Sequence, residues 1–417
     1  MTLSEAPPKL ADIERALLAT TELLAVELAS PTDTAPQWNE LEWRVAQAVA
    51  AMHGVSPLLA RTLRWQGPLT WQSFVQRQRE HTHLRHVRIV ELLEELDTRA
   101  SAGGIAFVPL KGAALCELGI YQAGDRPMAD IDILVAESDR EATGKLLRAM
   151  AYDESVSTWR NAVFETSGVK RVAELGEHCA NPIKIELHCL VAERQPVFEK
   201  NISSLVWPDR PRAGTNSYRS VSALMLHLLL HAFGNICDVG LRMIQLQDIA
   251  LLARRMSESD WDEVLPASVA AERWWLFPPL QCLSRYYPAS VPARTMSLAA
   301  SHRPWLLKLM DRDEKISSLS LSNARVQAFP AIRRAGSVEE MCRYVAGRIR
   351  PGQDVIKVRR ENAKGHPGAA GDRWAHASQG RRVLHWLFSR PTRMETMSSV
   401  NAALAPAVAM SIADKGR

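Results

Sequence analysis

The chain has 417 residues, of which 47% are hydrophobic and 23% are charged. This composition is that of a globular protein and excludes a mainly disordered chain, and 21 Gly and 23 Pro scattered without a period exclude a collagen-like one. The net charge of +5 is uneven, because residues 331–393 hold 14 Lys and Arg against five Asp and Glu, a net of +9. Such a segment is compatible with nucleic-acid or phosphate contact, but we favour a solvated, Arg-rich helical surface.

The cysteines and the apolar segments indicate the cellular location of the protein. The six cysteines form no C-x-x-C pair, and the first residues lack the basic and apolar regions of a secretion signal. The longest apolar run, Ala223–Phe233, is interrupted by His227 and His231 and is too short to span a bilayer. We therefore expect a cytoplasmic protein with reduced thiols and no membrane partner.

In chain order, residues 1–100 are predicted to be helical. Leu10–Leu28, Glu40–Met52 and Trp71–Leu96 each place apolar residues on one stripe with a period near 3.6. Gly103 and Gly104 are expected to end the last of these helices.

Residues 101–206 change to alternating strands and helices. The expected elements are a strand over Ile105–Leu110, a helix over Gly112–Leu118, a strand over Ile131–Val135, a helix over Ser138–Met150 capped by Ser138, and a strand over Ile183–Leu190. This order predicts an α/β or α+β core.

Residues 207–417 return to a helical period. Ser222–Gly234 and Leu241–Arg254 are predicted to be helices, Asn362–Arg373 a Gly-rich loop and Ala402–Met410 a weak terminal helix. Since Ser222–Gly234 is apolar on nearly every face, we expect this region to pack on the core and shape the acceptor side of its cleft.

Asp130 and Asp132 stand two residues apart at the start of an apolar strand, so their side chains share one face. Two such charges about 4 Å apart repel by roughly 4 kcal/mol at an effective dielectric near 20, which a cation offsets. Carboxylate oxygens suit Mg²⁺, with Mn²⁺ as an alternative. Asp311 and Asp313 repeat the D-x-D spelling in a predicted helix, where residues two apart diverge.

Two neighbouring segments complete this pattern. Lys111 and Gly112 end the first strand and open a helix, where backbone N–H groups can approach a phosphate. Glu186 and His188 share one face of the third strand, so Glu186 supplies a third carboxylate that can hold a metal or accept a proton. Together these residues favour phosphoryl or nucleotidyl transfer.

The chain resembles the bacterial family called uncharacterised nucleotidyltransferases, within the DNA polymerase β-like superfamily. The resemblance lies in Leu110-Lys111-Gly112, in Arg126-x-Met128-x-Asp130-Ile131-Asp132-Ile133-Leu134-Val135 and in Ile185-Glu186-Leu187-His188, and extends to His227, His231 and Leu246-Gln247-Asp248-Ile249. It covers roughly Leu92 to Leu252. It implies an α+β fold with a small mixed sheet, flanked by helical regions, that binds Mg²⁺ and an NTP, with ATP expected.

The resemblance also implies roles for single residues. By position, Asp130, Asp132 and Glu186 match the catalytic metal ligands, and Lys111, Gly112, Ala113 and Arg126 match the nucleotide-binding segment, while His188, His231 and Asp248 are candidates for an acceptor pocket. Ala113 departs from the superfamily, which usually has Ser or Gly there, so a weak, altered or lost activity stays open.

Other interpretations of these residues remain open. Lys111 suits a surface salt bridge as well as a phosphate, Arg126 suits a pair with Asp130, and Asp248 suits helix packing or a pair with Arg242. His188, His227 and His231 also suit core positions. The pairs His178-Cys179 and His188-Cys189 match no common zinc-finger spacing, so no zinc site is predicted.

Three functions compete at this point. The leading one is an Mg²⁺-dependent nucleotidyltransferase that uses an NTP and a small-molecule, peptide or protein acceptor. A degenerate module that binds nucleotide, RNA or protein is the second, supported by Ala113 and by residues 331–393. The third is a D-x-D sugar transferase acting on a peptide or metabolite, which normally requires a larger nucleotide-binding domain ahead of the motif.

Overall fold

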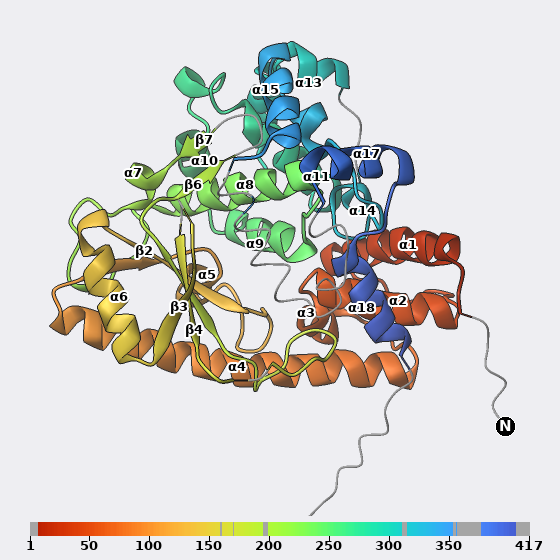
Figure 1. Ribbon diagram of the computed structural model, residues 1–417, viewed down its shortest axis with the longest axis horizontal. Coiled ribbons are helices and arrows are strands. Elements are labelled where there is room, and N and C mark those ends of the chain that lie inside the picture. The colour runs from red at the N-terminus through yellow and green to blue at the C-terminus, as the bar shows by residue number, and fades with distance from the viewer. Residues whose placement is uncertain are drawn as a thin grey trace, which may run out of the picture.

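A computed structural model describes residues 7–158, 161–169, 171–194, 199–310, 315–352, 356 and 377–405. It is a mostly helical α+β protein, in which a six-stranded mixed sheet is flanked by N-terminal and C-terminal helices (Figure 1). The α+β fold predicted from the sequence is therefore confirmed. Asp311, Asp313 and the segment 362–373 lie outside the described residues.

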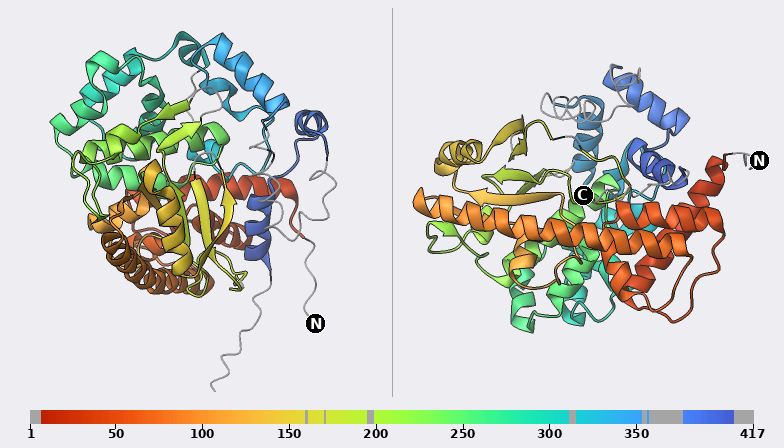
Figure 2. Two further views of the ribbon diagram at one scale, coloured as in Figure 1. Left: turned by 60° about the vertical axis from the view of Figure 1, so that its left-hand side comes forward. Right: turned by 90° about the horizontal axis from the view of Figure 1, so that it is seen from below.

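The N-terminal region is helical, as predicted. It contains α1 (Leu10–Ala29), α2 (Glu40–Met52), α3 (Ser56–Thr62) and α4 (Leu69–Ala102). Asn39 caps α2 by accepting the Glu42 N–H at 3.0 Å. The long helix α4 runs beneath both the N-terminal helices and the sheet (Figure 1), crosses in front of them when seen from below (Figure 2), and is followed by Gly103 at its C-cap.

The sheet has the strand order β3-β4-β5-β2-β1-β8. Its strands are β1 (Ala106–Pro109), β2 (Asp130–Val135), β3 (Tyr152–Ser157), β4 (Asn161–Thr166), β5 (Lys184–His188) and β8 (Gly214–Thr215), and β6 (Ala192–Arg194) and β7 (Glu199–Asn201) form a separate pair. In the centre, β2 runs parallel to β5 and antiparallel to β1.

Short helices connect the strands. They are α5 (Gly112–Glu117), α6 (Arg140–Ala149) and α7 (Ser203–Val206). The capping role predicted for Ser138 is wrong, because a 3₁₀ turn over Glu137–Asp139 precedes α6 and its N-cap position is Asp139. The strands β3 and β4 were not predicted, since β3 has mostly exposed, polar side chains that show no apolar alternation.

The C-terminal region is again helical. It contains α8 (Val221–Asp238), α9 (Met243–Ala253), α10 (Glu258–Val264), α11 (Phe277–Tyr286), α12 (Ala293–Ser301), α13 (Trp305–Met310), α14 (Ile316–Leu319), α15 (Val338–Ile349), α17 (Gln379–Ser389) and α18 (Met394–Leu404). By length and composition alone, α8 could cross a membrane, but 72% of it is buried inside the protein, as in a core helix. The last helix, α18, packs on α2.

The two faces of the sheet belong to different cores. Ile131 and Ile133 of β2 point to the face covered by α4 and α6, with Leu96 and Leu147 as neighbours in one apolar cluster. Leu134 points the other way, into a larger cluster that includes α8, α9 and the N-terminal helices. Because side chains alternate along a strand, Asp130 and Asp132 face this second side, toward α8 and α9.

Candidate active site

Three carboxylates from the sheet line a cavity of about 300 Å³ on the α8 and α9 side. Asp130 and Asp132 lie on β2, and Glu186 lies directly opposite Asp132 on β5. The Asp132 and Glu186 side chains are only 12% and 22% exposed. The strand pairing thus brings Glu186 beside Asp132, and all three carboxylates line the same cavity.

Burial and mutual repulsion make this carboxylate group electrostatically costly. Burial first, and then the charges of Asp132 and Glu186, raise the pKa of Asp130 from 3.8 to about 6. Burial would also raise the pKa of Asp132, but Lys111 and His188 hold that pKa well below its usual range. Lys111 and His188 therefore balance the charge of Asp132, while Asp130 has no such ion-pair partner among the described residues and would be stabilised by an additional cation in the cavity.

Lys111 and His188 both contact the Oδ1 atom of Asp132. The Lys111 ammonium lies 3.1 Å from it and the His188 Nε2 atom lies 2.8 Å from it. His188 Nε2 is also 3.5 Å from Glu186 Oε2, and that oxygen accepts a hydrogen bond from Asn161 at 2.7 Å. Lys111 is thus in a largely buried ion pair inside the site, so the surface salt bridge considered for it is wrong.

Asp132, Glu186 and His188 form a group of potential metal ligands at this site, with one ligand atom of each within 4.8 Å of the others. Asp130 lies outside this group although it lines the same cavity. Two residues that are two positions apart on one strand lie about 6.6 Å apart, whereas two residues paired across neighbouring strands lie only about 4.8 Å apart. Glu186 is therefore nearer to Asp132 than Asp130 is. His188 therefore joins the metal-ligand candidates, which its sequence position alone did not suggest.

The turn between β1 and α5 holds Lys111 in a rare conformation. Its φ is +47°, and its N–H group donates to the Tyr218 hydroxyl at 3.2 Å. The Ala113 N–H group donates to the Leu110 carbonyl at 3.2 Å, and the Ala113 side chain is only 2% exposed. Since α5 has only six residues, the turn offers a phosphate the Lys111 ammonium rather than a long helix dipole.

Arg126 and Asp248 form a buried, two-pronged ion pair across the cavity. Arg126 Nε and Nη2 lie 2.9 and 2.7 Å from the two Asp248 oxygens, and the Tyr121 hydroxyl donates to Asp248 at 2.6 Å. Arg126 therefore pairs with Asp248 of α9 and not with Asp130, so the pair considered between Arg126 and Asp130 is wrong. The pair considered between Arg242 and Asp248 is wrong for the same reason. Arg126 packs against Gly112, where a Cβ atom would meet its Nη1 at 2.2 Å.

The two histidines of α8 have different surroundings. His227 is buried, and its Nδ1 atom lies 2.7 Å from the hydroxyl of Tyr218, the residue that holds the Lys111 turn. His231 lines the cavity and lies 3.3 Å from Glu193 Oε1. Burial lowers the pKa of both imidazoles. His227 is thus a core histidine and His231 a cavity histidine.

Two charged residues of the cavity were not expected from the sequence. Glu177 comes from the segment between β4 and β5, and Arg242 precedes α9 and donates from Nε to the Met52 carbonyl at 2.9 Å. Arg242 thereby connects the N-terminal helices to the site. Its only sequence signal is a single charge within an apolar segment. Every residue predicted for the site except His188 lines this cavity, and His188 lines a small pocket next to it.

Comparison with known proteins gives one match. The family model described as uncharacterised nucleotidyltransferase matches residues 39–287, which is more than half of the chain and extends from α2 to the end of α11. No curated protein and no solved structure matches. The matched range contains the sheet, the carboxylates and the cavity, and the chain therefore belongs to the uncharacterised nucleotidyltransferase family.

Proposed function

We propose that this protein transfers a nucleotidyl group from an NTP, with ATP the expected donor, to an acceptor nucleophile. The observation that carries the proposal is the set of carboxylates Asp130, Asp132 and Glu186, in one cavity with Lys111 and Arg126. A cavity lined by both carboxylates and cations suits a triphosphate with its metal ion. Family membership supports an NTP and a divalent metal in general.

The donor atoms of the carboxylate group fit Mg²⁺, with Mn²⁺ as the alternative. Asp130, Asp132 and Glu186 would hold the ion through hard oxygen ligands. The raised pKa of Asp130 supports this fit, because the group favours one more positive charge than Lys111 and His188 supply. A bound ion would neutralise phosphate charge and orient the donor.

Lys111 and Arg126 are assigned to the donor phosphates. The Lys111 side chain reaches from Asp132 toward the cavity and can exchange that carboxylate for a phosphate oxygen. Arg126 is held rigidly by Asp248, and the missing side chain of Gly112 lets its guanidinium lie against the turn. Because Ala113 has no hydroxyl, phosphate contact at this turn depends on Lys111.

The acceptor and its proton are assigned to the other side of the cavity. The acceptor atom forms a bond to the α-phosphorus, the bond to pyrophosphate breaks, and the acceptor proton passes to the Glu186 carboxylate. His231 lines the acceptor side. His188 and Asp248 are positioning residues in this proposal, since His188 contacts Asp132 and both Asp248 oxygens contact Arg126.

Calorimetry with a non-hydrolysable ATP analogue tests the assignment. We expect Mg²⁺ to strengthen its binding at least about tenfold in the native chain, and not in Asp130→Asn/Asp132→Asn. Asp311→Asn/Asp313→Asn is the matched control, because it removes a D-x-D pair of the same spelling. Equal strengthening in all three chains would remove the metal site from the proposal.

The same samples separate the competing functions. A degenerate binding module predicts no effect of Mg²⁺, together with RNA binding that weakens steeply with salt. A sugar transferase predicts stronger binding of a nucleotide sugar than of ATP. The helical residues before β1 disfavour the sugar transferase, since they supply no second nucleotide-binding sheet among the described residues.

A further inference from the structure

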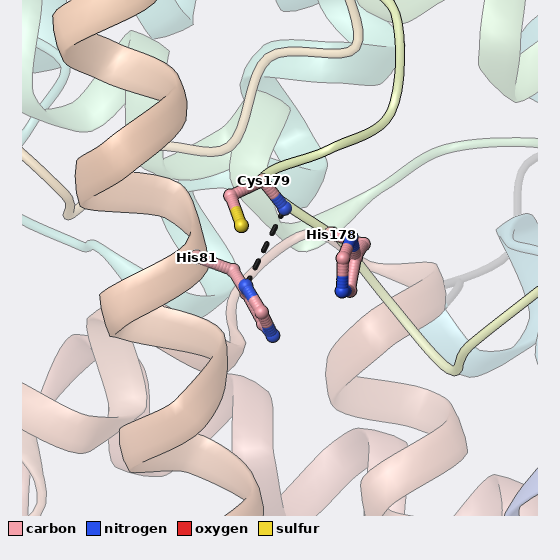
Figure 3. A group of neighbouring side chains, drawn as sticks. All are labelled: His81, His178 and Cys179. Carbon is pink, nitrogen blue, oxygen red and sulfur yellow. Dashed lines mark hydrogen bonds between the residues drawn. The ribbon is translucent and has the colours of Figure 1, made fainter. Parts of the chain in front are cut away.

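A second group of potential metal ligands lies away from the cavity, between α4 and the segment that connects β4 to β5. Figure 3 shows His81 from α4 next to His178 and Cys179 from that segment. One ligand atom of each lies within 4.8 Å of the others, and the two imidazole centroids are 4.4 Å apart. All three side chains are half-buried, so a solvated ion can reach them.

We propose that His81, His178 and Cys179 bind a zinc-class divalent ion, independently of any nucleotide. Two imidazoles and one thiolate form a nitrogen and sulfur ligand set, which selects Zn²⁺ over Mg²⁺. Tetrahedral zinc bonds of about 2.0–2.3 Å put neighbouring ligand atoms about 3.4–3.7 Å apart. The observed spread therefore has to close by about 1 Å, which rotation of half-buried side chains provides.

Contacts already in place hold the two parts of this site together. Gln78, one turn before His81, donates to the Leu175 and Glu177 carbonyls at 3.1 Å and accepts the Glu177 N–H at 2.8 Å. One turn after His81, Arg85 donates to the Asn181 carbonyl at 2.7 Å. The segment 175–181 is thus fixed on α4 without metal, so little ordering entropy opposes binding.

The local hydrogen bonds also fit an exchangeable metal. The Cys179 N–H lies 3.4 Å from His81 Nδ1, and the Ala180 N–H donates to His178 Nδ1 at 3.1 Å. Coordination through these nitrogens exchanges two neutral backbone hydrogen bonds for metal bonds. A water molecule or Glu174 could take the fourth coordination position of the ion. Burial lowers the pKa of His81, and the charge of Glu174, which belongs to the same segment, acts in the opposite direction.

The proposed zinc site shares its segment with the cavity wall. Glu177 lies next to His178, pairs with Arg85 at 3.2 Å and lines the cavity that contains the carboxylates. An ion on His81, His178 and Cys179 would therefore add a further link between α4 and the segment that carries Glu177. We infer a structural role at the edge of the cavity rather than a share in the chemistry.

Titration of the full-length, metal-free protein with Co²⁺ tests this proposal. A thiolate-to-cobalt charge-transfer band is expected at one equivalent, and the group of Asp132, Glu186 and His188 cannot give it because it has no sulfur. Cys179→Ser should abolish the band. His81→Ala should weaken Co²⁺ binding at least about tenfold, the least that even outer-shell contacts contribute. His83→Ala, on the same helix, and Cys342→Ser, at an exposed cysteine, are matched controls that should keep the band.

A second measurement uses the native chain and so does not depend on whether a variant folds. Zn²⁺ should slow alkylation of Cys179 at least about tenfold relative to Cys342, as read by mass spectrometry, because a metal-bound thiolate is a poor nucleophile. Absence of the cobalt band in the native chain, its persistence in Cys179→Ser, or unchanged alkylation of Cys179 would each overturn the proposal.

Discussion

Two regions of this protein gather potential metal ligands in different electrostatic settings. Among the described residues, the groups are Asp132, Glu186 and His188 on the sheet, and His81, His178 and Cys179 between α4 and the β4–β5 segment. The first is largely buried and negatively charged, whereas the second is half-buried and can be neutral. Their donor atoms also differ, because the first is rich in oxygen and the second in nitrogen and sulfur.

This difference decides what each group of ligands requires when no metal ion is bound. The largely buried carboxylates need positive charge nearby, and Lys111 and His188 supply it at Asp132. Neutral imidazoles and a thiol need no nearby cation. Metal can therefore bind to and leave the His81 group as its concentration changes, without unfolding the protein. We therefore expect a metal at the carboxylate site to govern activity and a metal at the His81 site to add stability without affecting the chemistry.

The largest expected effect is on catalysis. Asp130→Asn/Asp132→Asn removes the charges that hold the metal, which is worth several kcal/mol of transition-state stabilisation, or about a thousandfold in rate. The measurement is pyrophosphate release from an NTP, with a fractionated cell extract as the source of acceptor. Asp311→Asn/Asp313→Asn should keep the native rate. If Asp130→Asn/Asp132→Asn keeps the native rate of pyrophosphate release, these carboxylates do not hold a catalytic metal.

The next effect is on stability without metal. Since the pKa of Asp130 is raised to about 6 in the folded protein, the native chain loses stability as the pH rises from about 4 through 6. Asp130→Asn has no such loss. In EDTA at pH 7.5 the variant should therefore be more stable than the native chain, by up to roughly 3 kcal/mol, and at pH 4 or below the two should match. Urea unfolding at both pH values measures this.

Identical unfolding curves of Asp130→Asn and the native chain at pH 7.5 would mean that Asp130 bears no charge penalty. The contrast between the two ligand groups would then be lost. Glu141→Gln is a suitable control, because its side chain is 81% exposed and its charge lies outside the cavity.

Zinc is expected to stabilise the fold through the second group. At a free Zn²⁺ concentration a hundred times the Kd, a ligand that binds only the folded state adds about 2.7 kcal/mol. Thermal or urea unfolding of the native chain should show this gain, and Cys179→Ser should show little of it. An equal gain in Cys179→Ser would place the stabilising ion elsewhere.

The smallest effect concerns the tight packing at the carboxylate site. A Cβ atom at position 112 would lie 2.2 Å from Arg126 Nη1, so Gly112→Ala has to displace the guanidinium. Loss of one charge-assisted hydrogen bond to phosphate weakens NTP binding by about 1.5 kcal/mol, or roughly tenfold. Calorimetry measures it, with Gly347→Ala, which has open space at its Cβ position, as the control.

The sequence predicted the parts of the site that depend on local periodicity. Asp130, Asp132 and Glu186 stand within short apolar strands, where alternation decides the face of each side chain. The pairing of Arg126 with Asp248 and the cavity positions of Glu177 and Arg242 depend on contacts between distant segments, which no local pattern encodes.

The His81 group was missed for the same reason. Cys179 lies 98 residues from His81, on an irregular segment, so no ligand spacing of a known zinc motif relates them. The edge strand β3 was missed because its polar, partly exposed side chains lack apolar alternation, and β4, which pairs with it, was missed as well. The roles of the site residues stay predictions.

The long helix α4 has a consequence for the order in which the chain folds during synthesis. Its first half, with Trp71 and Phe74, packs in the core of the N-terminal helices, and its second half, with Leu92 and Leu96, packs in the core beneath the sheet. Its 34 residues are synthesised well before β5 appears. At about 5–20 residues per second, the second half of α4 waits roughly 4 to 17 seconds for β5. During that time Leu92 and Leu96 lack the last central strand of the apolar cluster that covers them in the finished fold.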